Sequence, residues 1–250
     1  MAAQVEVLLL RFDAPLMSFG GVVVDERGPT LPFPTTSLLT GLIANALGWE
    51  HRHAERLERL QRRLRHAARR DRRGEALEDY QTVDLGQEFL ARGWTTWHAP
   101  ESRGGGPAKT GTHIRHRHYW ADAVYTVALT LDPAAEAPTL EEVAAALDEP
   151  ERPLFLGRKP CLPSRPLLLA PQRVRAASLR AALAAAPPDP RARPEGGYFD
   201  AWWPEDDGEA PGEREARRLP VYDRRDWANQ VHTGRRFVWA GRVPAAEAGR

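Results

Sequence analysis

The segment 31–48 constrains the fold more than any other part of the sequence, because a proline-stiffened stretch runs directly into an amphipathic helix. Apolar residues recur at helical spacing over 38–47, and Gly48 stands where helices commonly end in a left-handed residue. Backbone N–H groups at a helix N-terminus have no partner within the helix, so they either receive a cap or bind an anion. We therefore predict that the hydroxyls at the start of this helix either cap it or help to hold a phosphate. These hydroxyls belong to Thr35, Thr36 and Ser37.

Two apolar segments, 5–12 and 124–131, predict buried strands of one sheet. Thr139 and Glu142 form a capping box that predicts a second amphipathic helix. A further apolar segment at 167–170 is consistent with a closing strand. The order of these elements predicts an α+β fold with a βαββαβ, ferredoxin-like (RRM-like) domain whose short helices pack on one face of an antiparallel sheet.

More chain separates the first helix from the strand at 124–131 than this fold needs, which predicts an insertion. Its first part, 51–73, contains many arginines around a narrow apolar stripe and is predicted to be a basic helix with a solvated face, with contact to DNA phosphates as the alternative. Its second part, 78–118, has three consecutive glycines near its middle and is predicted to be a projecting arm.

The last third of the chain has a different composition, which suggests a domain at 1–170 followed by a C-terminal extension at 171–250. Within the extension, 187–218 is rich in Pro, Gly, Glu and Arg and predicts a mobile surface loop. Order is expected to resume in short strands at 219–222 and 235–240.

Composition excludes several classes of protein. The 35 basic and 34 acidic residues nearly cancel, so net charge alone does not indicate nucleic acid. Cys161 is the single cysteine, so no intramolecular disulfide can form, and the absence of zinc-ligand spacing predicts neither a metal nor another cofactor. No secretory signal or membrane span is recognised, which predicts a cytoplasmic protein without a membrane partner.

The segment 110–120 is the densest polar and aromatic stretch of the chain. If it is extended, alternation places Arg115, Arg117 and Tyr119 on one face, where guanidinium groups could bind phosphates and the ring could stack on a base. A solvated edge strand is the alternative. The histidines of this segment also suggest a metal-independent endoribonuclease, because RNA cleavage by general acid–base catalysis needs an imidazole near the 2′-hydroxyl.

Several motifs together resemble one family. The turn at 15–20 and the helix entry at 31–37 are followed by matching segments at 79–83, 119–129 and 154–167. In their order and spacing they resemble the CasD family, the fifth class of CRISPR-associated proteins within the RAMP superfamily. The similarity covers roughly the first two thirds of the chain, and it is greatest to the type I-E branch.

The resemblance implies an RRM-like fold with a protruding thumb at 78–118. It also implies a non-catalytic, RNA-binding subunit of a type I-E Cascade ribonucleoprotein in antiviral defence, which binds the 5′ handle of crRNA and caps the backbone filament. The implied partners are crRNA, the repeated backbone subunit, the large PAM-reading subunit and target DNA within the complex.

From the motifs and the resemblance together, we predict a set of RNA-binding residues that includes a Gly-basic-basic loop at 157–159. The set is Ser18, Arg27, Thr35, Thr36, Ser37, Tyr80, Gln81, Thr82, Arg115, Arg117, Tyr119, Trp120, Arg158 and Lys159. No catalytic residue is assigned. The alternatives to this subunit are the endoribonuclease, which would use the 113–118 histidines, and a ferredoxin-like scaffold that binds only protein.

Overall fold

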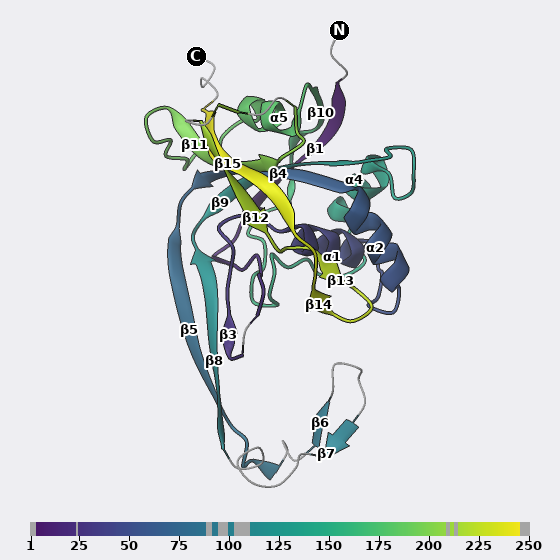
Figure 1. Ribbon diagram of the computed structural model, residues 1–250, viewed down its shortest axis with the longest axis vertical. Helices are drawn as coiled ribbons and strands as arrows, with labels where there is room; N and C mark the ends of the chain where they lie inside the picture. The colour runs from purple at the N-terminus through teal and green to yellow at the C-terminus, as the bar shows by residue number, and fades with distance from the viewer. Residues whose placement is uncertain are drawn as a thin grey trace.

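The computed structural model describes residues 4–23, 25–88, 92–94, 100–102, 111–208, 211–212 and 215–245. Its main sheet has the strand order β10-β1-β9-β4-β11-β15-β12, and every neighbouring pair is antiparallel (Figure 1). These strands are β1 (Val5–Asp13), β4 (Leu64–Arg72), β9 (Val124–Leu131), β10 (Leu168–Ala176), β11 (Tyr198–Pro204), β12 (Ala216–Val221) and β15 (Arg236–Pro244).

The predicted α+β class is confirmed, and so are the two predicted strands, since β1 and β9 lie side by side in the sheet. Helices α1 (Thr36–Ala46) and α4 (Leu140–Asp148) share one hydrophobic core with these strands. The predicted capping box is present, because the Thr139 hydroxyl accepts from the Glu142 backbone N–H while the Glu142 carboxylate accepts from that of Thr139. Local sequence therefore sets where α4 begins.

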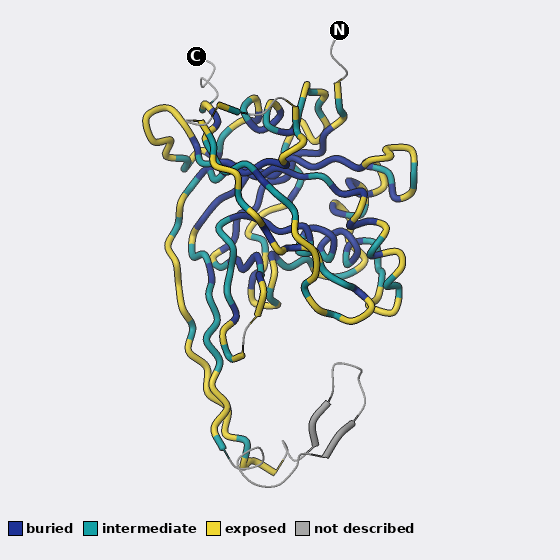
Figure 2. Tube along the Cα trace, viewed as in Figure 1, coloured by how far each residue is buried: buried dark blue, intermediate teal, exposed yellow. Residues whose placement is uncertain are grey.

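The opposite face of the sheet is covered by α5 (Leu179–Ala185), which packs with β1, β4, β9 and β15 in a second core cluster. Consecutive residues, whose side chains point to opposite faces of the sheet, are consequently both buried along β1 and β9, as the dark tube in the centre of Figure 2 shows. Continuous apolar strands are typical of a sheet covered on both faces.

The prediction of one basic helix over 51–73 was wrong beyond its first half. Helix α2 (Ala54–Arg63) ends there, and the chain continues as β4 in the middle of the main sheet. Arg63 and Arg69 are buried and not solvated. The Arg63 guanidinium donates to the Ala137 and Pro138 carbonyls and lies 3.6 Å from the Glu136 carboxylate, and Arg69 pairs with Asp71, so both charges have partners inside the protein, although Nε of Arg63 has no hydrogen-bond partner among the described residues.

The predicted mobile loop at 187–218 was wrong for 198–204, which forms β11 between β4 and β15. Phe199, Trp202 and Trp203 are buried there, and their apolar area explains why this short run is ordered between Pro- and Gly-rich segments. The strands expected at 219–222 and 235–240 correspond largely to β12 and β15.

The long strands β5 (Glu75–Asp84) and β8 (Thr112–Ala121) pair with each other and extend away from the body as an arm (Figure 1). At its base, β8 also pairs with β2 (Leu16–Met17) and β3 (Arg27–Gly28). Two further short pairs are β6 (Arg92–Trp94) with β7 (Pro100–Ser102) and β13 (Arg225–Asp226) with β14 (Val231–His232). In the described part of the chain, no helix has the length and apolarity needed to cross a membrane.

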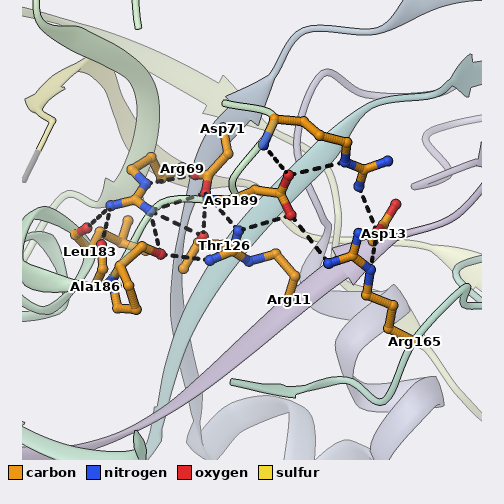
Figure 3. Close-up of polar contacts among 11 residues, drawn as sticks. Arg11, Asp13, Arg69, Asp71, Thr126, Arg165, Leu183, Ala186 and Asp189 are labelled. Atoms are coloured by element: carbon orange, nitrogen blue, oxygen red, sulfur yellow. Dashed lines mark hydrogen bonds and ion pairs between the residues drawn. The ribbon is translucent and has the colours of Figure 1, made fainter. Parts of the chain in front are cut away.

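A buried network of charges ties the C-terminal part of the chain to the sheet (Figure 3). Asp71 on β4 accepts from the Arg69 guanidinium at 2.7 Å and pairs with Arg11 of β1 at 3.0 Å. The same carboxylate accepts from the Thr126 hydroxyl at 3.0 Å and from the Asp189 backbone N–H at 2.9 Å. One carboxylate thereby connects β1, β4, β9 and the segment after α5.

Candidate nucleic-acid interface

The N-terminus of α1 is occupied by groups of the protein itself. Thr35 is the N-cap, and its hydroxyl accepts from the Leu38 backbone N–H at 3.2 Å. The Asp223 carboxylate accepts from the backbone N–H of Thr36 at 2.8 Å and from its hydroxyl at 3.1 Å. Because Thr35 and Thr36 are buried and the anion position holds a carboxylate, the capping alternative is confirmed, and neither hydroxyl is available to hold a phosphate.

Asp223 is held by a charged partner from β15. Burial alone would raise the pKa of this carboxyl, but hydrogen bonds and the charge of Arg236, at 2.7 and 2.8 Å, bring it to about 2. Nε2 of His66 lies 3.3 Å from the Arg236 guanidinium and 3.1 Å from the Pro34 carbonyl oxygen, which can only accept a hydrogen bond. Burial, followed by the Arg236 charge, lowers the pKa of His66 to about 3, so this imidazole is neutral at physiological pH.

Beside this helix terminus lies a cavity of about 570 Å³, bounded by the loop before α1, α1 itself, β8 and the β13–β14 hairpin. We call it the α1 cavity. The lining includes five of the predicted RNA-binding residues, which come from four separate parts of the chain: Ser18, Ser37, Arg115, Arg117 and Arg158. Three residues that the sequence analysis did not select also line it, namely Arg225, Trp227 and His232.

The arginines of the α1 cavity bond to neutral acceptors. Arg115 donates to the Asp25 carbonyl at 3.1 Å, and the Nε of Arg117 donates to the Gln81 side chain at 3.0 Å. Arg158 donates to the carbonyls of His118 and Gly28, both at 2.8 Å. Within the described residues, none of these guanidinium groups forms an ion pair with a carboxylate, although the acidic residues Asp25 and Glu26 also line the cavity. The positive charge is only partly offset.

Gly157 lets the loop pass close to Ser18 and so positions Arg158. Its φ is +111°, and a Cβ at this position would lie 1.7 Å from the Ser18 carbonyl oxygen. The guanidinium of Arg158 then lies across Gly28 and 4.8 Å from the centre of the Tyr119 ring. Lys159, next in sequence, is exposed and does not line the cavity.

Of the two aromatic residues predicted on β8, Tyr119 is buried and Trp120 is half-buried. Tyr119 is buried in the main core beneath Arg158, so the prediction that it stacks on a base was wrong. Its position near the base of β8 explains this, because the strand joins the body there. Trp120 packs against the same core, and its indole N–H donates to the Leu31 carbonyl at 2.8 Å. Ser18, although in the lining, donates its hydroxyl to the His118 carbonyl.

The remaining predicted residues lie on the arm and on β3. Tyr80 is 57% exposed, and its ring lies edge-on, 5.2 Å from that of His116. Gln81 and Thr82 follow it on the exposed strand β5, and Arg27 is exposed on β3 beside β8. These four residues surround the strand that carries Arg115 and Arg117 but do not line the α1 cavity.

The histidines of β8 do not form a metal site. His116 is bonded through Nδ1 to the Glu78 carboxylate on β5, and this hydrogen bond lowers the pKa of Glu78. Among the described residues, no group of three or more His, Cys, Asp or Glu side chains could hold a metal ion. The pair of His116 and Glu78 is one that sequence spacing could not reveal, since 38 residues separate them.

Comparison with known proteins defines the class of this chain. The family model described as CRISPR-associated protein (Cas_Cas5) matches residues 7–239, so the chain belongs to the Cas5 family of CRISPR-associated proteins. Over 170 residues it is 31% identical to the CRISPR system Cascade subunit CasD of Escherichia coli (strain K12). The aligned segment covers 65% of this chain and 69% of that protein.

Two solved structures are similar over almost the whole length of the chain. The first is a chain of a CRISPR RNA-guided surveillance complex, with a TM-score of 0.63 at 26% sequence identity. The alignment covers 98% of this chain and 95% of that chain. A structure described as a Cas protein has a TM-score of 0.61 at 26% identity and covers 95% of both chains. The resemblance inferred from the sequence motifs is thereby confirmed at the level of the family.

Proposed function

We propose that this chain is an RNA-binding, non-catalytic subunit of a type I-E CRISPR Cascade surveillance complex, and that the α1 cavity holds the 5′ handle of crRNA. The observation that carries this proposal is the convergence on one cavity of four arginines that form no ion pair with a carboxylate of the described residues, namely Arg115, Arg117, Arg158 and Arg225. Membership of the Cas5 family and the similarity to a Cascade subunit support it.

The chemistry of the cavity suits single-stranded RNA. Guanidinium groups bind phosphate oxygens through paired N–H donors. A phosphate would supply the negative charge that the protein does not place beside these guanidinium groups. Tyr80 presents an exposed ring on the arm close to these arginines, where a splayed base could stack. Phosphate contacts would hold the backbone, while stacking and base-edge contacts would read the handle.

We infer that β1, α1, β4, β9, α4 and β10 form a ferredoxin-like unit within the predicted 1–170 domain, and that 171–250 extends its sheet. The spatial order β10-β1-β9-β4 and the chain order strand-helix-strand-strand-helix-strand support this assignment. Strand β10 crosses the expected boundary at 170, so the extension is continuous with the domain.

We also propose that the β5–β8 arm is the thumb that contacts the neighbouring backbone subunit when this chain caps the filament. Leu77, Val83 and Ile114 are large apolar side chains exposed along the arm. Such residues gather where a protein surface is covered by a partner. The large PAM-reading subunit and target DNA would complete this cytoplasmic ribonucleoprotein.

The test is binding of repeat-derived RNA to the purified full chain, with RNA length resolved on the same gel. We expect the intact handle RNA to bind, and Arg115→Gln to weaken binding about tenfold, equivalent to about 1.4 kcal/mol. Arg217→Gln is the matched control, because this exposed arginine lies on β12 outside the α1 cavity. Equal binding by both variants would contradict the proposal, and no RNA binding by any form would favour the protein-only scaffold.

The endoribonuclease is the second candidate function, and the contact between His116 and Glu78 at the cavity favours it. A carboxylate on Nδ1 would orient the imidazole for proton transfer through Nε2. If this activity exists, the same gel would show defined cleavage of repeat RNA without metal, and His116→Ala would abolish cleavage while Arg115→Gln would mainly weaken binding.

A further inference from the structure

The β13–β14 hairpin adds a second cationic wall to the α1 cavity, built from residues far from the family motifs. Arg225 and His232 are direct cross-strand partners in this hairpin, and both line the cavity. Arg115 and Arg158 reach the same cavity from β8 and from the loop after α4. The two sets of cations therefore enclose one space from different parts of the chain.

The hairpin is held rigidly against α2. Gln61 of α2 accepts from the Arg225 backbone N–H at 2.9 Å and donates to the Arg225 carbonyl at 2.8 Å. The Trp227 backbone N–H donates to Glu58 at 2.8 Å, and its buried ring packs with Ala44 of α1. These contacts involve the backbone of Arg225 and not its guanidinium, so the side chain is positioned without being neutralised.

The side chains of this wall are incompletely satisfied. Nε of Arg225 and Nδ1 of His232 are buried, and neither has a hydrogen-bond partner among the described residues. The guanidinium donates to the Gln230 carbonyl at 3.1 Å, and burial lowers the pKa of Arg225 without any carboxylate to oppose the effect. Both residues are half-buried, and the Arg225 guanidinium also lies over the Trp227 ring at 5.5 Å. A buried nitrogen atom without a hydrogen-bond partner is costly unless a ligand completes it.

We propose that Arg225 and His232 form a separate phosphate subsite of the α1 cavity, which binds a phosphodiester of the single-stranded RNA held there. This inference rests on the proposed function, because it assigns a second contact on the same ligand. Gly41 of α1 and Trp227 of the hairpin line the cavity as well, so the proposed subsite borders α1. Arg225 supplies the charge, and His232 donates or relays a hydrogen bond in its neutral form.

The experiment measures the affinity of the full chain for repeat-derived handle RNA as a function of salt concentration. For a single strand, each phosphate contact contributes about 0.7 to the slope of log affinity against log salt. We expect Arg225→Gln to reduce the slope by about 0.7 and to weaken binding about tenfold at low salt. Arg225→Lys keeps the charge, so it should keep the slope while weakening binding less.

Arg224→Gln is the matched control, because Arg224 is the exposed neighbour of Arg225 and does not line the cavity. It should bind within about twofold of the unmodified chain, with the same slope. The melting temperature of Arg225→Gln should be unchanged or higher, since the substitution removes a half-buried charge that has no carboxylate partner among the described residues, together with its unpaired buried Nε. A lower melting temperature together with an unchanged slope would show a purely structural role and overturn the inference.

The two proposals fail in different ways. If Arg225→Gln binds RNA like the unmodified chain while Arg115→Gln binds weakly, the subsite is wrong and the proposed function stands. If the unmodified chain binds no handle RNA, alone or with the backbone subunit, the proposed function is wrong, and the subsite inference falls with it.

Discussion

Arg69 and Arg115 carry the same charge in opposite surroundings. Arg69 lies in the network of Figure 3, where it pairs with Asp71 and donates to the Ala186 carbonyl at 2.9 Å. Arg115 lines the α1 cavity and donates to a single backbone carbonyl at 3.1 Å. The first arginine is complete without a ligand, whereas most donors of the second have no hydrogen-bond partner among the residues that the structure describes.

The comparison teaches that counting arginines does not locate a nucleic-acid site in this chain, because arginines such as Arg11 and Arg69 are buried and serve the fold. What separates the two groups is whether a carboxylate accompanies the guanidinium. In the network, Asp71 and Asp189 balance Arg11 and Arg69 within the protein. In the cavity, the arginines bond to neutral acceptors, and under the proposed function RNA phosphates would supply the balancing charge.

The largest effect is expected in the buried network. Asp71→Asn should lower the free energy of unfolding by about 3–5 kcal/mol, because it leaves two buried guanidinium groups without their shared carboxylate. Urea denaturation measures this change. Asp206→Asn is the control, since Asp206 is 76% exposed in its pair with Arg65 and should change stability by less than about 1 kcal/mol. Equal effects of the two variants would contradict the contrast between buried and exposed arginine pairs.

The next effect is expected where the fold positions a cavity arginine. Gly157→Ala should destabilise the protein by about 2–4 kcal/mol, because its Cβ would overlap the Ser18 carbonyl and its φ is left-handed. RNA affinity should fall as well, since Arg158 would be displaced. Gly196→Ala is a suitable control, because it has a positive φ but no atom within 4 Å of the added Cβ. A stable Gly157→Ala variant with normal affinity would show that this close approach is not needed.

A pH dependence should arise from the charges at the start of α1. Between about pH 6.5 and 3 the unfolded chain protonates His66 while the folded chain does not, because the folded pKa is about 3. Stability should therefore fall with decreasing pH, by about 1.4 kcal/mol per unit at most. His66→Gln should remove this part of the dependence, and exposed His51→Gln should retain it, in urea titrations from pH 7 to 4.5. Parallel curves for both variants would refute the assignment.

The smallest effect is expected on the arm. Tyr80→Ala should weaken handle RNA binding by about 1 kcal/mol through loss of stacking, with little change in stability. Fluorescence anisotropy with labelled RNA measures the affinity. Tyr198→Ala, which removes an exposed ring from β11, is the control and should bind RNA normally. If both variants bind alike, base stacking on Tyr80 is not part of the site.

Local signals predicted the parts of the fold that depend on local physics. The capping box at Thr139 and the apolar strands β1 and β9 could be predicted from neighbouring residues, whereas the close approach of Gly157 to the distant Ser18 could not. Strand β11 could not, because the Pro- and Gly-rich composition around it hides three buried aromatic residues. Composition averages over a segment, whereas burial is decided residue by residue.

The site shows the same division. Arg115, Arg117 and Arg158 were predicted from motifs, but the role of Asp223 at Thr36 could not be, since 187 residues separate the two. Arg225 and His232 were missed for a similar reason. The stretch 224–232 mixes basic, polar and aromatic residues much as 110–120 does, and this composition is the signal that could have marked it.

The most direct test of the central claim is to map where handle RNA touches the full chain, by ultraviolet crosslinking and mass spectrometry of the crosslinked peptides. The account predicts crosslinks in the peptides that line the α1 cavity, at 18–29, 111–121 and 225–232. The face formed by β11, β15 and β12 also carries arginines, including Arg217, Arg218 and Arg242. Crosslinks concentrated on that face, with the cavity peptides unmodified, would contradict the claim that arginines without carboxylate partners mark the RNA site.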